Sequence, residues 1–205
     1  MKRRRRLHDD TGTKMTRSKR QCCVKHVDLN TWFTPTERVQ RNIVHAFQHV
    51  SGSVWFHDIE RKLFDRISDT SHAYAACTSP WASNLRWIQH CAHNLLGLSL
   101  VTFHDKPSSI RRLAAYKQCK PLRDRDRVRT LSTGSGYNRC IIHQKVVVLL
   151  DTDAKPVEVL LGSYNLSNGS SRNIETMVQI CDPGVATVFY DEFCRVYGIA
   201  HTFLR

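Results

Sequence analysis

Apolar and polar residues follow two different spacings along the chain, which predict helices and strands in turn. Apolar residues that recur every three or four positions form one face of an amphipathic helix. Helices are predicted on this basis at four places: 35–50, 59 to about 67, 83–94 and 184–197. Short apolar runs predict buried strands at 54–56, 73–77, 98–103, 140–150 and 157–161. This alternation predicts an α/β layered sheet.

Polar residues predict where two of these helices begin. Thr34 is expected to cap the first helix, because Pro35 suits the first helical position and Glu37 completes a capping box. Ser83 is expected to cap the helix that runs to about Asn94.

The first 28 residues lack any apolar periodicity and are rich in Arg, Lys, Thr and Asp. This composition predicts a basic, disordered tail at 1–28, followed by one folded domain at 29–205. A solvated tail and a functional arm both stay open. In a eukaryotic or viral setting, Lys2–Arg6 is typical of a nuclear localisation signal.

The formal net charge of the chain is +13, and its pI is near 9.7. A field of this sign favours polyanions, with nucleic acid first and anionic membrane surfaces second. A polar, basic connection occupies 106–130. If it is extended, four alternating arginines line one face and contact substrate phosphates: Arg123, Arg125, Arg127 and Arg129. The alternative is a solvated basic loop.

The eight cysteines are an even number, which would suggest disulfides only in an exported chain. The longest aliphatic run, Val146 to Leu150, is far shorter than the roughly 20 residues that span a bilayer, and no secretory signal is recognised. We therefore expect a cytoplasmic protein, or a nuclear one in a eukaryotic or viral source, with most cysteines as reduced core thiols. Cys22 and Cys23 with His26 are a candidate metal site, but the chain has no C-x2-C pair, so neither a metal nor a cofactor is predicted.

A concentrated set of reactive side chains lies between residues 143 and 175. His143 and Lys145 are two apart on a predicted strand, so both side chains are expected on one face. Ser163 and Asn165 follow the paired strand, and Glu175 comes ten residues later. A neutral imidazole can attack phosphorus, while an ammonium, a hydroxyl and an amide hold the phosphate oxygens. The carboxylate is expected to accept the other ring N–H of His143.

This arrangement resembles the signature of the phospholipase D superfamily, which reads H-x-K-x4-D, then G-S-x-N and a downstream N-x-E. The chain has H-Q-K at 143–145, G-S-Y-N at 162–165 and N-I-E at 173–175. The resemblance implies an α/β phospholipase D-like sandwich with a mixed β-sheet flanked by helices, and one HKD motif in each chain. It also implies metal-independent cleavage through a phosphohistidine. Because the family's catalytic unit uses two motifs, it implies a homodimer with one His143 as nucleophile and the other as acid.

The aspartate of the motif departs from the family pattern. Position 150 is leucine, and the nearest acids are Asp151 and Asp153. The supporting role is assigned to Asp151, with an ordinary turn aspartate as the alternative. A second H-x-K, at 104–106, has no G-S-x-N behind it and is interpreted as coincidence.

Three functions fit these residues. The first is a nuclease, most simply an endonuclease, that acts on DNA or RNA, which the basic charge favours. The alternative is a phospholipid hydrolase of the cardiolipin type, since anionic lipid also suits a basic surface. The third is an inactive nucleic-acid-binding module, against which the intact motif argues. Trp81 and Trp87 fit either a membrane-facing or base-stacking patch or helix packing, and helix packing is favoured.

Overall fold

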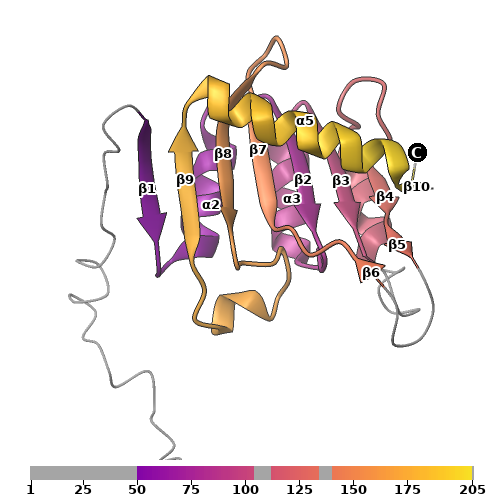
Figure 1. Ribbon diagram of the computed structural model, residues 1–205. Helices are drawn as coiled ribbons and strands as arrows, with labels where there is room; N and C mark the ends of the chain where they lie inside the picture. The colour runs from indigo at the N-terminus through magenta and orange to yellow at the C-terminus, as the bar shows by residue number, and fades with distance from the viewer. Residues whose placement is uncertain (1–49, 104–111, 134–139, 205) are drawn as a thin grey trace, which may run out of the picture. The chain divides into compact units, whose positions relative to one another are not determined.

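The computed structural model describes residues 50–103, 112–133 and 140–204. Within them, eight strands form one mixed sheet in the order β1-β9-β8-β7-β2-β3-β4-β10 (Figure 1). Their bounds are β1 Ser51–Trp55, β2 Tyr74–Ser79, β3 Gly97–Thr102, β4 Val128–Thr130, β7 Val146–Leu150, β8 Pro156–Gly162, β9 Met177–Cys181 and β10 His201–Leu204. A two-stranded sheet pairs β5 Ser132–Thr133 with β6 Cys140–Ile141.

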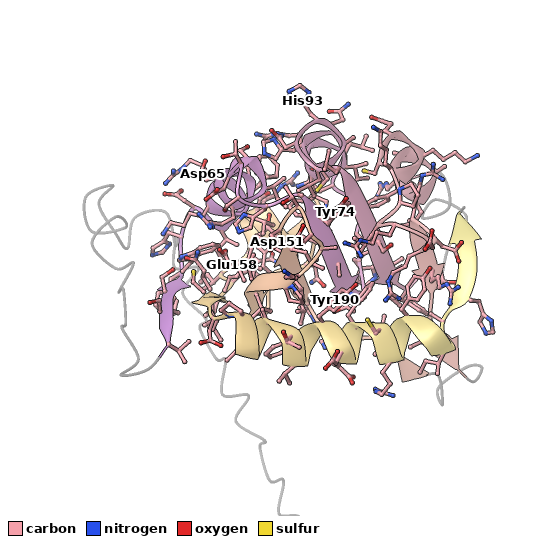
Figure 2. All side chains as sticks on the ribbon, turned by 90° about the horizontal axis from the view of Figure 1, so that it is seen from above. Asp65, Tyr74, His93, Asp151, Glu158 and Tyr190 are labelled. Carbon is pink, nitrogen blue, oxygen red and sulfur yellow. The ribbon has the colours of Figure 1, made fainter. Side chains whose placement is uncertain are left out.

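Helices cover both faces of the large sheet (Figure 2). Helices α2 (Ile59–Ser68) and α3 (Leu85–Asn94) lie on one face, and α5 (Pro183–Ile199) lies on the other. Two short 3-10 helices, η1 (Ala114–Gln118) and η3 (Ser170–Arg172), lie in connections. The α/β sandwich with a mixed sheet is therefore confirmed.

Strand β2 shows how the sheet separates its two cores. Its residues alternate between the faces, as side chains on a strand must. Ala75 and Cys77 join the core beneath α2 and α3, whereas Ala76 joins the core beneath α5. Both sides of the strand are apolar because both faces of the sheet are covered.

Strand directions place the ends of several elements at one edge of the sheet. Strands β2, β3 and β4 are parallel, so their carboxyl ends share that edge. Strand β7 is antiparallel to β2, with Thr78 opposite Val146 and Tyr74 opposite Leu150. The residues just before β7 therefore meet the carboxyl end of β2. Strand β8 also ends there, because it is antiparallel to β7.

The predicted helix cap and one predicted strand need correction. Asn84, not Ser83, caps α3, since its Oδ1 accepts hydrogen bonds from the backbone nitrogens of Arg86 at 3.0 Å and Trp87 at 3.3 Å. The strand predicted at 140–150 is interrupted, because residues 142–145 lie outside both β6 and β7.

Several predictions concern residues outside the described ranges. These are the tail at 1–28, the helix at 35–50, the H-x-K at 104–106, and the cysteine–histidine group at 22–26. They stay predictions.

Three buried thiols confirm part of the expectation for cysteine. Cys77, Cys91 and Cys119 are free and buried, and burial raises the pKa of the Cys119 thiol to about 11. In the described part of the chain, no group of three or more His, Cys, Asp or Glu side chains is placed to hold a metal ion. No described helix is both long and apolar enough to cross a membrane.

Candidate active site

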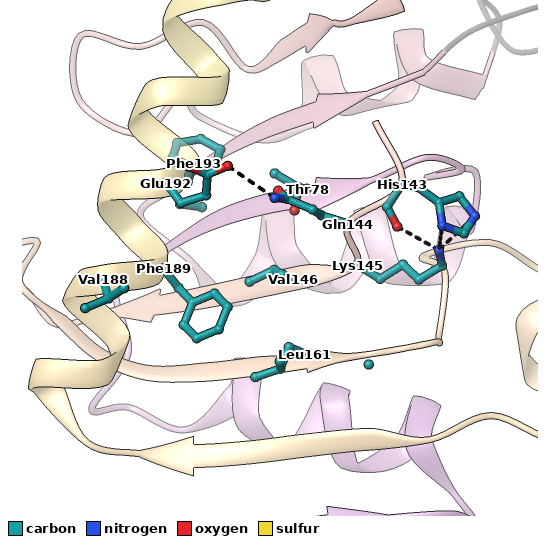
Figure 3. A pocket seen from close by; sticks show the side chains of 12 residues that line it. Thr78, His143, Gln144, Lys145, Val146, Leu161, Val188, Phe189, Glu192 and Phe193 are labelled. Atoms are coloured by element: carbon teal, nitrogen blue, oxygen red, sulfur yellow. Dashed lines mark hydrogen bonds between the residues drawn. The ribbon is translucent and has the colours of Figure 1, made fainter. Parts of the chain in front are cut away.

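His143 and Lys145 come together at the sheet edge where β7 begins. The Lys145 Nζ donates a hydrogen bond to the His143 carbonyl oxygen at 2.9 Å and lies 3.3 Å from each ring nitrogen (Figure 3). The expectation that both residues lie on a strand is wrong, since they precede β7. Their side chains meet because Lys145 folds back over the histidine.

Trp81 borders the same imidazole. Its ring centroid lies 6.3 Å from that of His143, and the two rings are perpendicular. This indole is 42% exposed, whereas Trp87 is buried in the core beneath α3. The prediction of a packing role is therefore confirmed for Trp87 and wrong for Trp81. The sequence signal for Trp81 was its position just after the buried strand β2.

Gly162 ends β8 beside the reactive pair. Its backbone nitrogen donates to the Lys145 carbonyl oxygen at 3.2 Å. A Cβ at this position would collide with the backbone carbonyl oxygen of Thr176. The glycine of the G-S-x-N segment is therefore required by a close approach of two backbones.

Ser163, Asn173 and Glu175 form one hydrogen-bonded network. The Ser163 hydroxyl donates to one carboxylate oxygen of Glu175, and the Asn173 side-chain amide donates to the other at 3.1 Å. The backbone nitrogen of Thr176 donates to the Ser163 hydroxyl oxygen at 2.9 Å. Three polar residues of the two predicted segments are thus joined beside β9.

The carboxylate of Glu175 acts on Lys145 and not on the histidine of its own chain. Among the described residues its hydrogen bonds go to Ser163 and Asn173, so the expected bond to the His143 ring is not made. Burial lowers the pKa of the Lys145 ammonium, and the charge of Glu175 partly offsets that effect. The buried carboxylate therefore helps to keep the lysine protonated.

Asn165 lies in the loop that follows β8. Its Oδ1 atom is buried and has no hydrogen-bond partner among the described residues. Within the described part of the chain its side chain makes no hydrogen bond to the imidazole or the ammonium, so its expected place beside them stays a prediction. An unpaired buried amide oxygen is rare in proteins, and such groups are often found at functional sites.

Solved structures share this arrangement of strands and helices. NucT from Helicobacter pylori matches with a TM-score of 0.57 and 16% identity over 75% of this chain and 99% of that one. Nuc from Salmonella typhimurium, a phospholipase D family member, matches with a TM-score of 0.56 and 17% identity over 75% and 97%. The chain has the phospholipase D fold. A polyphosphate kinase from Porphyromonas gingivalis also matches, with a TM-score of 0.51 and 12% identity over 72% of this chain and 24% of that one. No protein-family model and no curated protein sequence matches the chain.

Asp151 lies at the opposite edge of this phospholipase D fold from His143, because the two residues lie beyond opposite ends of β7. It follows β7, and its backbone nitrogen donates to the Lys155 carbonyl oxygen at 3.0 Å. Its Oδ1 atom accepts from the backbone nitrogen of Lys155 at 2.8 Å. The carboxylate closes the turn between β7 and β8, so it cannot touch a substrate held at His143. Its assignment to the catalytic residues is corrected to a role in this turn.

The basic connection before β4 also lies away from the reactive pair. Arg123 precedes β4, so it sits where the parallel strands begin, while His143 sits where they end. Its φ of 49° turns the chain, so the segment is not extended. Its guanidinium donates to the carbonyl oxygen of Asp153, in the turn after β7.

The other three arginines of this segment bind the protein itself. The guanidinium carbons of Arg125 and Arg129 lie 5.0 and 3.9 Å from the ring centre of Tyr197 in α5. The Nε of Arg127 donates to the Cys119 carbonyl oxygen at 2.7 Å. The prediction that four arginines line one face beside the active site is therefore wrong, because they anchor the connection to α5 and to the turns around it.

A pocket of about 460 Å³ opens beside the histidine and lysine. It lies between α5 and the sheet, and Thr78, Gln144, Phe189 and Glu192 are among its lining residues (Figure 3). Sequence reasoning missed these four. The alternation along β2 does place Thr78 on the α5 face, but no sequence pattern indicated that α5 would leave space there.

Proposed function

We propose that this protein is a metal-independent phosphodiesterase that cleaves nucleic acid through a phosphohistidine. The observation that carries the proposal is the exposed His143 with the Lys145 Nζ at 3.3 Å from its ring nitrogens. An imidazole and an ammonium held this close can share one phosphate group, the first as nucleophile and the second as the charge that balances its oxygens.

The proposed reaction has two steps. In the first, a ring nitrogen of His143 attacks phosphorus, and the bond between phosphorus and the leaving oxygen breaks as that oxygen takes a proton. In the second, water attacks phosphorus, the phosphorus–nitrogen bond breaks to restore the imidazole lone pair, and the proton that water loses returns to the group that protonated the leaving oxygen. Lys145 balances the charge of the phosphate oxygens in both steps.

One chain holds only one such histidine–lysine pair in its H-x-K and G-S-x-N segments. We propose that two copies place their pairs across a two-fold axis, so that the partner subunit's His143 protonates the leaving oxygen. Endonucleolytic action fits this proposal, because a site at an open edge of the sheet can accept a nucleic-acid chain away from its ends.

Nucleic acid is favoured as substrate by the formal charge of +13. Arg172 in η3 is an exposed cation in the loop that connects Ser163 to Glu175, so it can add a phosphate contact there. A phospholipid hydrolase of the cardiolipin type is the alternative. It is supported by Trp81 and Ile174, two exposed apolar side chains in the segments next to the site.

A cleavage assay tests the proposal. Purified protein is incubated in EDTA with labelled single- and double-stranded DNA, RNA, and cardiolipin vesicles. We expect nucleic-acid cleavage that His143→Ala abolishes and that His93→Ala, a change at an exposed histidine on α3, leaves intact. Lipid hydrolysis without nucleic-acid cleavage would establish the alternative. Binding without any cleavage would establish an inactive nucleic-acid-binding module.

A further inference from the structure

The pocket beside the catalytic pair is built mainly of apolar walls. Val146 on β7 and Leu161 on β8 form its floor, and Phe189 and Phe193 of α5 face them (Figure 3). Its rim includes the residues of the H-x-K segment. A chemical group that is bonded to a phosphate at this rim can therefore occupy the pocket while the phosphate stays beside the catalytic pair.

Thr78 supplies a polar atom inside these walls. The residue is only 3% exposed, and its Oγ1 has no hydrogen-bond partner among the described residues. It lies on β2 directly opposite Val146, so it is one residue away from Lys145 along the paired strand. Leaving a buried hydroxyl unpaired costs free energy, and a ligand that bonds to it recovers that cost.

Gln144 and Glu192 add hydrogen-bonding groups at the mouth. The Gln144 amide donates to the Glu192 carboxylate at 3.3 Å, and Arg195 holds that carboxylate from the other side at 2.7 Å. The mouth thus offers both a donor and an acceptor. A fitting ligand has apolar faces and a polar edge, which describes a nucleobase.

An acyl chain fits this lining less well. It would cover the apolar walls, but it would leave the Thr78 hydroxyl unpaired. The observations therefore favour a base over a lipid tail.

We propose that this pocket binds the base of a nucleotide next to the scissile phosphate. The inference rests on the proposed nuclease function and adds a determinant of substrate choice. A base can enter only when it is unstacked from its neighbours, so single-stranded nucleic acid is the preferred substrate.

The test compares a single-stranded DNA oligonucleotide with an abasic oligomer of equal length and charge. We expect wild type to cleave the base-containing chain about tenfold faster, in line with one or two hydrogen bonds and the burial of a ring. Thr78→Val, which keeps the shape and removes the hydroxyl, should lower this ratio about fivefold.

A second variant tests the pocket without changing the buried Thr78. Val188 lines the pocket from α5 and is 67% exposed, so Val188→Trp obstructs the pocket without disturbing the core. Val188→Trp should bring the ratio of the two cleavage rates, base-containing over abasic, close to one. Ile199→Trp, at an exposed site on the same helix, should keep the wild-type ratio. Melting curves confirm that each variant is folded.

The outcomes separate the two proposals. Equal cleavage of both oligomers by wild type would overturn the base pocket and leave the nuclease function standing. No cleavage of either oligomer, together with no cleavage of RNA in the assay above, would overturn the nuclease function itself. Cardiolipin hydrolysis that Val188→Trp blocks would show that the pocket holds an acyl chain.

Discussion

At the residue scale, the chemistry of the proposed site depends on one ammonium group that touches an imidazole and feels the charge of a carboxylate. Lys145 touches His143 directly, and burial lowers its pKa while the charge of Glu175 acts in the other direction. The lysine is thus held near the reacting atoms at some cost in solvation. The Ser163 hydroxyl and the Asn173 amide keep the carboxylate in place.

The lowered pKa of Lys145 predicts the alkaline side of the pH–rate profile. A lysine with a lowered pKa loses its proton below pH 10.5, the ordinary value, so activity should fall as pH rises toward that point. In Lys145→Arg this alkaline fall should disappear, because guanidinium stays charged, while the overall rate drops about 100-fold. Steady-state rates from pH 6 to 11 provide the measurement.

The matched control is Lys155→Arg, at an exposed lysine in the turn beyond β7. It should keep both the rate and the alkaline fall. An alkaline fall that persists unchanged in Lys145→Arg would show that another group is titrating.

At the element scale, helix α3 is fixed by the residue just before it, which caps the helix and binds the neighbouring helix α2. Asn84 accepts from two backbone nitrogens of the first turn, and its side-chain amide donates to Glu60 of α2 at 2.7 Å. The same side chain therefore caps one helix and ties it to another. Since α3 connects β2 to β3, this cap supports the edge at which Trp81 meets His143.

Two adjacent substitutions separate the observed cap from the expected one. Asn84→Ala should lower the free energy of unfolding by about 1–2 kcal/mol, because two backbone N–H groups lose their acceptor. Ser83→Ala should change it by less than about 0.5 kcal/mol, as is usual for a polar residue without a capping role. Urea unfolding followed by circular dichroism measures both. An equal or larger loss for Ser83→Ala would contradict the observed cap.

At the scale of the whole molecule, strand direction decides which residues form the site. The carboxyl end of β2, the start of β7 and the end of β8 meet at one edge, where they bring His143, Lys145 and Ser163 together. The opposite edge receives Asp151 and the turn at Arg123. The phospholipase D fold thus presents one histidine–lysine pair at an open edge, and we propose that a second copy completes it.

Mixed dimers test the shared site. Wild-type and His143→Ala chains with different tags are produced together at equal levels, and the heterodimer is purified through both tags. If two histidines cooperate, the heterodimer should retain far less than half of the wild-type activity, because each reaction needs both subunits. A heterodimer with half the activity, or an active monomer in sedimentation, would contradict the shared site.

The sequence by itself determined the layered α/β fold and named most of the residues of the proposed site. Both follow from local sequence patterns: the fold from the spacing of apolar residues, and the site residues from the segments H-Q-K, G-S-Y-N and N-I-E. The tertiary structure alone decided which residues lie near one another. It placed Asp151 and Arg123 at the far edge, set Trp81 against His143, and left Thr78 unpaired in a pocket. The physical reason is that such proximity depends on strand direction and on how α5 packs across the sheet, and both arise from contacts between segments far apart in the chain.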